Sequence, residues 1–107
     1  MYAVIFEVQP KTELAAKDYF DLAAELRTEL EEIDGFISVE RFSSLSDEEK
    51  FLSISFWRDE KALKQWREHH QHRKAQQKGR GEIFKDYRII VAKVIRDYGI
   101  TNRKEAP

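Results

Sequence analysis

The sequence lacks cysteine altogether, and its 107 residues include only 4 glycines, 2 prolines and one methionine. Without thiols, the protein has no disulfides, no thiolate nucleophile and no thiolate ligand for a metal. It also lacks any apolar run close to the roughly 20 residues of a membrane span. Its first residues show no basic segment of the kind that begins a signal peptide. We therefore expect a cytoplasmic protein that does not contact membranes.

An excess of charge of either sign is missing too. The chain has 19 basic and 20 acidic side chains, and this net charge of -1 gives no reason to expect a nucleic-acid partner. A content of 41% hydrophobic and 12% aromatic residues is typical of a packed domain rather than of a disordered chain. No linker, repeat or low-complexity segment divides it. We expect one domain over residues 1–98, followed by a polar tail over residues 99–107.

Four strands are predicted from the alternation of side chains along the sequence. The first covers residues 2–9 and ends at Pro10, which has no N–H group to donate to a sheet. The second and third cover residues 36–43 and 51–57, and a polar hairpin connection joins them. The last strand covers about residues 86–97.

The first of two predicted helices covers about residues 13–32. Thr12 is its expected N-cap, and Asp34-Gly35 ends it because Gly35 can take a positive φ. One face of this helix is an apolar stripe, and the other is polar. The stripe consists of Tyr19, Leu22, Ala23, Leu26, Leu30 and Ile33, and the polar face carries Lys17, Asp21, Glu25, Glu29 and Glu32.

The second helix is expected to run from its cap, Asp59, to about residue 77, where residues 78–81, Lys-Gly-Arg-Gly, interrupt it. A helix turns by about 100° per residue, so Trp66 and His70 share a face with Leu63. His69 lies at the edge of that face, and His72 is almost opposite Leu63. Both tryptophans and all three histidines of the chain fall within residues 57–72.

The order of these elements, β-α-β-β-α-β, predicts an α+β fold of the ferredoxin-like type, with an antiparallel sheet and both helices on one face. The last strand is nevertheless apolar on both sides, whereas a sheet face open to water is expected to be polar. Another copy of the same sheet is the simplest cover, so we expect a homodimer in which two sheets pack face to face. Loops and the tail are the alternative cover. The side chains concerned are Tyr87, Ile89, Val91 and Ile95 on one face, Ile90, Ala92 and Val94 on the other, and Phe51 and Trp57, which point away from Leu52, Ile54 and Phe56.

Four pieces of the sequence together resemble a known family. They are Ile33-Asp34-Gly35-Phe36, Ser55-Phe56-Trp57-Arg58-Asp59-Glu60-Lys61-Ala62-Leu63, Trp66 with His72, and Tyr87-Arg88-Ile89-Ile90-Val91-Ala92-Lys93-Val94. In order and spacing they are similar to the antibiotic biosynthesis monooxygenase domain, and the likeness covers about residues 2–98. It implies a dimeric α+β barrel.

The resemblance also implies a chemistry. One group of these enzymes oxidises electron-rich phenols with O2 and uses no metal, flavin or haem, because the substrate supplies the electrons. By that analogy no cofactor is expected, and the ligand is a small aromatic or hydrophobic molecule. Trp66 is the expected pocket residue, and His69, His70 or His72 is the expected base. Family analogy favours His72 and helix geometry favours His69 or His70, so the choice stays open here.

A second group of the family degrades haem, and it defines the alternative function. Its mechanism needs an Asn on the first strand, a Trp, and a His further along the second helix as iron ligand. Trp66 matches, but the first strand reads Ile5-Phe6-Glu7, and Ala75-Gln76-Gln77 stand where the His is needed. The alternatives are therefore a haem-binding or haem-degrading oxygenase-like protein, or a dimer that binds a hydrophobic ligand without catalysis.

Overall fold

The structure, a computed structural model, describes the backbone of residues 1–76 and 84–101 and the side chains of residues 1–69 and 84–101. The helix interruption predicted at residues 78–81 lies outside the described residues, as does most of the predicted tail.

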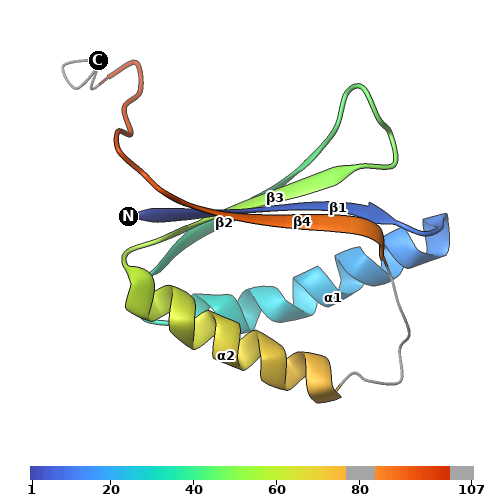
Figure 1. The fold of residues 1–107 in the computed structure, drawn as a ribbon, viewed down its shortest axis with the longest axis horizontal. Helices are drawn as coiled ribbons and strands as arrows, with labels where there is room; N and C mark the ends of the chain where they lie inside the picture. The colour runs from blue at the N-terminus through green and yellow to red at the C-terminus, as the bar shows by residue number, and fades with distance from the viewer. Residues whose placement is uncertain (77–83, 102–107) are drawn as a thin grey trace.

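One antiparallel sheet and two helices make up the fold (Figure 1). The sheet has the strand order β2-β3-β1-β4, and both helices lie on the same side of it. This confirms the ferredoxin-like arrangement predicted from the element order. The elements are β1 (Tyr2–Pro10), α1 (Glu13–Glu31), β2 (Phe36–Ser43), β3 (Phe51–Trp57), α2 (Glu60–Gln76) and β4 (Phe84–Lys93).

The register of the strands decides which side chains face the helices. Val4 on β1 pairs with Ser55 on β3 and with Val91 on β4, and paired residues point to the same side of a sheet. The helix side carries Val4, Phe6 and Val8 of β1, Phe51, Ser55 and Trp57 of β3, and Tyr87, Ile89 and Val91 of β4. The opposite side, called the open face below, carries Ala3 and Ile5, Leu52, Ile54 and Phe56, and Ile90 and Ala92. Phe51 and Trp57 therefore face the helices, and Leu52, Ile54 and Phe56 are the residues that the helices leave uncovered.

Helix α1 begins and packs as its sequence predicts. The Thr12 hydroxyl accepts a hydrogen bond from the backbone N–H of Ala15 at 3.0 Å and so caps the helix. The apolar stripe points to the sheet, with Tyr19, Ala23 and Leu30 buried. Leu30 belongs to the core cluster that also contains Val39, Trp57 and Ala62.

The turn after α1 is tied to the start of α2. Gly35 has a φ of +97°, the conformation expected for it, and its carbonyl accepts a 2.7 Å hydrogen bond from the N–H of Arg58. The Arg58 guanidinium makes two parallel bonds of 3.1 Å to the Asp34 carboxylate. Asp59 then caps α2, because its carboxylate accepts from the N–H of Ala62 at 2.9 Å. The turn after α1 and the segment before α2, which both belong to the sequence pieces that resemble the family, are therefore held together by hydrogen bonds.

The predicted last strand differs most from the observed one. We expected residues 86–97, whereas β4 is Phe84–Lys93. The strand β4 ends early because its partner strand ends: Lys93 pairs with Tyr2, the first residue of β1. The backbone N–H of Val94 donates a 2.9 Å hydrogen bond to the carbonyl of Met1, beyond the end of the strand. The end of β1 also differs from the prediction, because Pro10 is the last residue of the strand rather than the residue after it. The register of the pairing between β1 and β4 shifts between Gln9 and Pro10.

The helices of the described part of the chain are too short or too polar to cross a membrane.

Candidate functional site

A row of rings crosses the core from β2 to α2. Phe36 meets Trp57 edge to face, with centroids 5.3 Å apart. Trp57 stacks on Trp66 at 6.2 Å and an interplanar angle of 28°, and Trp66 contacts the His69 ring at 5.7 Å and 31°. This row, Phe36–Trp57–Trp66–His69, brings together two of the residues that the sequence singled out, Trp66 and His69.

The two tryptophans differ in exposure. Trp57 is only 1% exposed, and its indole N–H donates a 2.9 Å hydrogen bond to the buried Ser55 hydroxyl. It is a core residue packed with side chains of both helices, so the prediction that Trp57 needs cover from another copy of the sheet is wrong. Trp66 is half-buried and packs against the core cluster from the helix side. It therefore joins the core to the outer part of α2.

His69 lies beside a carboxylate of the other helix. Its Nε2 atom is 3.4 Å from Oε2 of Glu29 on α1, and both atoms are covered by protein. At this distance the contact is an approach of two polar groups rather than an aligned hydrogen bond. The His69 side chain is 40% exposed and that of Glu29 is 29% exposed, so the pair lies at the margin of the interface between the helices.

The predicted position of Glu29 is wrong. The sequence predicts it on the polar face of α1, but it is half-buried and approaches His69 of α2. A signal was available: Glu29 falls three residues after Leu26 and four before Ile33, so it continues a row of the apolar stripe. The carboxylate within this row faces the other helix, where its Oε2 atom lies 3.4 Å from Nε2 of His69.

The side chains of His70 and His72 lie outside the described residues. Both belong to α2 (Glu60–Gln76), and their candidacy as bases stays a prediction.

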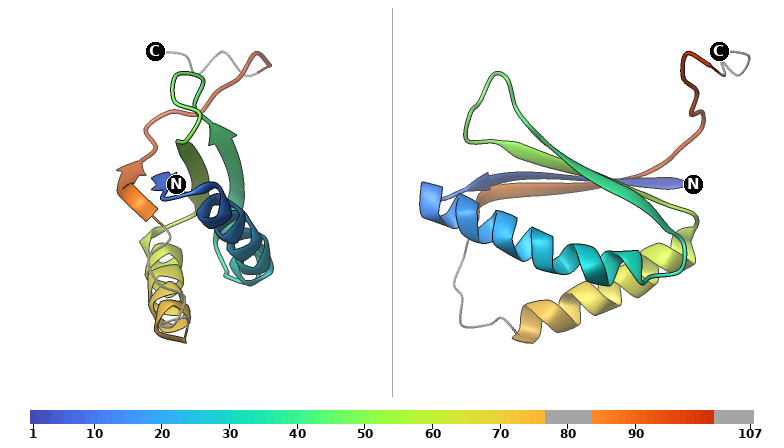
Figure 2. Two further views of the ribbon diagram at one scale, coloured as in Figure 1. Left: turned by 90° about the vertical axis from the view of Figure 1, so that its right-hand side faces the viewer. Right: turned by 180° about the vertical axis from the view of Figure 1, so that it is seen from behind.

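Within the described part of the chain, part of the helix side of the sheet is exposed. Tyr87, Ile89 and Val91 point to this side but are 58%, 55% and 59% exposed. Among the described residues the helices pack mainly on β1, β2 and β3, so most of the edge strand β4 is left exposed, although Phe84 at its start packs against Tyr19 of α1. Figure 2 shows α2 set apart from β4 in the view along the strands. We call these three side chains the β4 wall.

An aromatic cluster closes one end of the β4 wall. Phe6 contacts Tyr87 edge to face at 6.0 Å and Tyr19 at 6.5 Å. Phe84 packs against both Phe6 and Tyr19, at 5.8 Å and 5.5 Å. The apolar surface of the wall therefore continues into rings from β1 and α1, on the same side of the sheet as Trp66.

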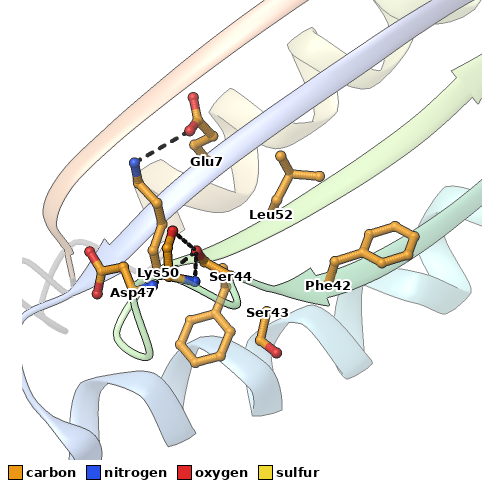
Figure 3. A pocket seen from close by; sticks show the side chains of 9 residues that line it. Glu7, Phe42, Ser43, Ser44, Asp47, Lys50 and Leu52 are labelled. Carbon is orange, nitrogen blue, oxygen red and sulfur yellow. Dashed lines mark hydrogen bonds and ion pairs between the residues drawn. The ribbon is translucent and has the colours of Figure 1, made fainter.

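Two concave regions lie elsewhere, at the hairpin end of the sheet. They measure about 550 Å³ and about 360 Å³ and share Glu7, Asp47 and Lys50, and Figure 3 shows the first of them. Glu7 pairs with Lys50 at 3.5 Å and with Arg88 at 2.5 Å. The hydrogen bond from Arg88 holds the pKa of Glu7 below its usual value. Neither region is lined by Trp66 or His69, so they do not form the expected site.

No group of three or more His, Asp or Glu side chains is placed to hold a metal ion in the described part of the chain.

The comparisons with known proteins identify the family. The sequence profile described as Antibiotic biosynthesis monooxygenase matches residues 1–78, and the chain belongs to this family. The family resemblance inferred from the sequence is therefore confirmed.

One similar sequence is the jasmonate monooxygenase ABM of Pyricularia oryzae, which is 47% identical over 94 residues. This match covers 88% of the present chain but only 43% of the relative, so the chain spans less than half of that protein. Two solved structures share the fold. A mutant of MhuD of Mycobacterium tuberculosis, with two manganese protoporphyrins per active site, has a TM-score of 0.74 at 14% identity, and the match covers 92% of this chain and 99% of that one. SnoaB, a cofactor-independent oxygenase of Streptomyces nogalater, has a TM-score of 0.70 at 10% identity, with 90% and 94% covered.

Proposed function

We propose that the protein is a monooxygenase that uses O2 on a small aromatic or electron-rich molecule without a cofactor. The observation that carries the proposal is the placement of Trp66 and His69 on the side of the sheet where the β4 wall is left exposed. Exposed apolar side chains on the same side of a sheet as a polar, titratable group are what a small-molecule site requires.

The chemistry requires a base and an apolar surface. His69 accepts a proton from the substrate, because imidazole accepts protons near neutral pH. The resulting anion is electron-rich enough to reduce O2. When the reacting group is a methylene between two aromatic rings, one oxygen atom becomes the ketone oxygen and the other leaves as water with both methylene hydrogens. The substrate then supplies all the electrons. The β4 wall and Trp66 would hold the ring system, and His70 and His72 remain candidates for the same proton transfer.

Jasmonate is a second candidate substrate, which the 47% identity to a jasmonate monooxygenase supports. Hydroxylation of an unactivated carbon follows RH + O2 + 2e⁻ + 2H⁺ → ROH + H2O, so this reaction needs an external two-electron donor. The two substrate classes are therefore distinguished by whether turnover depends on added reductant.

We further propose that the protein works as a homodimer that pairs its open faces. Ile5, Ile54 and Ile90 lie side by side on that face as cross-strand partners. They form a half-buried apolar row on the side of the sheet where neither helix lies (Figure 1). Another copy of the same face offers an equal row, which is the geometry of a two-fold interface.

The test is O2 consumption by the purified chain with an anthrone, a hydroquinone and jasmonate, the last with and without NADPH as electron donor. Incorporation of ¹⁸O from ¹⁸O2, read by mass spectrometry, identifies a monooxygenase. We expect His69→Asn to lower kcat by about 100-fold and Trp66→Phe to lower it as well. If none of these substrates is oxidised, the proposal fails. A Soret band on haem titration without turnover would instead select the haem-binding alternative.

A further inference from the structure

We propose that Glu29 is a positioning residue that orients His69 for proton transfer, an inference that rests on the proposed function. It starts from the contact between Nε2 of His69 and Oε2 of Glu29, 3.4 Å apart on different helices. Glu29 does not touch the substrate in this proposal. It acts through the imidazole.

The burial of the pair shows which side of the ring is available. The Nε2 atom of His69 is covered, whereas its side chain as a whole is 40% exposed. The accessible part of the side chain therefore lies away from Glu29. A substrate approaching His69 meets the rest of the ring, where the second nitrogen, Nδ1, is found.

Two contacts hold the imidazole in one orientation. The Glu29 carboxylate lies at the Nε2 edge, and the Trp66 indole lies beside the imidazole, with centroids 5.7 Å apart and planes at 31°. Contacts on two different sides of the ring favour one orientation of the side chain. Trp66 is itself held by its stacking on the buried Trp57, so the contact between Trp66 and His69 links the imidazole to the core.

This arrangement has a defined chemical consequence. When Nε2 carries the proton, the N–H lies on the side of the ring next to Glu29, and Nδ1 keeps its lone pair, as a base requires. The proton removed from the substrate goes to Nδ1, and the negative charge of Glu29 stabilises the imidazolium that forms. The proton stays on the imidazole and is not passed on to the carboxylate, as in hydrolase triads built on the same logic. The contact is long for a hydrogen bond, which is common in ligand-free sites that tighten on binding.

The first test needs no substrate. In ¹⁵N-labelled protein at low temperature, we expect a downfield proton resonance coupled to the His69 ring nitrogen, protected by its carboxylate partner. His69→Asn assigns it, and Glu29→Leu should abolish it. The matched control is Glu31→Leu, which removes a carboxylate of the same helix that pairs with Arg27 in solvent, at 3.2 Å. Absence of the resonance in the unmodified protein, or its survival in Glu29→Leu, would show that Glu29 does not pair with His69 and would overturn the proposal.

The second test uses whichever substrate is oxidised. We expect Glu29→Leu to lower kcat at least about tenfold and to change KM less than about twofold, because a positioning residue acts on the chemical step. Glu31→Leu should leave both constants unchanged. If Glu29→Leu does not fold, Glu29→Gln, which keeps the size but not the charge, takes its place. An unchanged kcat overturns the positioning role even where the resonance is seen. If no substrate is oxidised, the proposed function fails, while the resonance still decides whether the pair exists.

Discussion

A Cβ atom at position 35 would lie 2.7 Å from the Cβ atom of Ala62, so Gly35 and Ala62 are packed as closely as a hydrogen side chain allows. Ala62 is 1% exposed and belongs to the core cluster. Its first-turn position in α2 is set by the cap at Asp59. The turn after α1 and the start of α2 therefore fit together only when residue 35 has no side chain.

Replacement of Gly35 by alanine is the first prediction. The substitution adds a methyl group that overlaps Ala62, and it places an L-residue at a φ of +97°. Overpacking costs about 1–3 kcal/mol and the backbone conformation about 1–2 kcal/mol, so we expect the free energy of unfolding to fall by about 3 kcal/mol. For a chain of this size that lowers Tm by roughly 10–20 °C. Thermal unfolding followed by circular dichroism measures it.

The control for this variant is Gly99→Ala. Gly99 is exposed, and Gly35 is the glycine with a positive φ among the residues that the structure describes. Gly99→Ala should leave Tm within about 2 °C. Equal Tm values for the two variants would show that the close approach of residues 35 and 62 does not constrain the fold.

Ser55 provides the second prediction. Its hydroxyl accepts the indole N–H of Trp57 at 2.9 Å inside the core. Ser55→Ala leaves that N–H buried without an acceptor, which costs about 1–3 kcal/mol. We expect a lower midpoint in urea unfolding, and an m-value that does not change. Ser53→Ala on the same face of β3 is the control, and a midpoint as low as that of Ser55→Ala would argue against the hydrogen bond as the cause.

The local part of the fold was predictable from the sequence because its signals are local. β2 and β3 have the predicted bounds, residues 36–43 and 51–57, since alternation and turn residues define both ends. The caps at Thr12 and Asp59 were predicted for the same reason. The end of β4 was not, because it depends on where β1 runs out of residues to pair with.

The candidate site was predictable only in part. Trp66 and His69 could be placed on one region of α2 from helix periodicity alone. The contact of His69 with Glu29 depends on how two helices cross, and no pattern within either helix contains that angle. The exposure of Ile89 likewise depends on which strands the helices cover, and the alternation along β4 does not reveal it.

The third prediction concerns acid. Two hydrogen bonds from Arg58 hold the pKa of Asp34 below its usual 3.8. Because the folded-state pKa is lowered, the stabilisation by this pair is complete above the unfolded pKa and is lost as the pH falls through the folded one. We expect Tm to fall below about pH 4. Asp34→Asn should have a lower Tm at neutral pH and a shallower fall in acid.

The control for the acid prediction is Asp21→Asn, on the exposed face of α1. Its Tm should follow that of the unmodified protein over the whole range. A fall in acid that is equally steep in Asp34→Asn would mean that the ion pair with Arg58 contributes nothing to the pH dependence. Other carboxylates whose pKa is lowered, Glu7 and Asp59, would then carry it.

Two neighbouring isoleucines of β4 give the last prediction, because they point to opposite sides of the sheet. Ile89 pairs with Phe6 on the helix side and belongs to the β4 wall. Ile90 pairs with Ile5 on the open face. Each is replaced by aspartate, which makes the same chemical change one residue apart on the same edge strand.

We expect Ile90→Asp to disrupt the proposed dimer interface and Ile89→Asp to disrupt the proposed ligand surface, each without the other effect. Ile90→Asp places a carboxylate in the apolar row, and burying it without a partner is costly, so we expect a monomer in sedimentation velocity. Ile89→Asp should remain a dimer, yet lose at least about tenfold in kcat/KM, since the charge meets the substrate surface. A dimer in Ile90→Asp would contradict pairing through the open face. Full activity in Ile89→Asp would remove the β4 wall from the site, because a substrate that tolerates a carboxylate there does not rest on it.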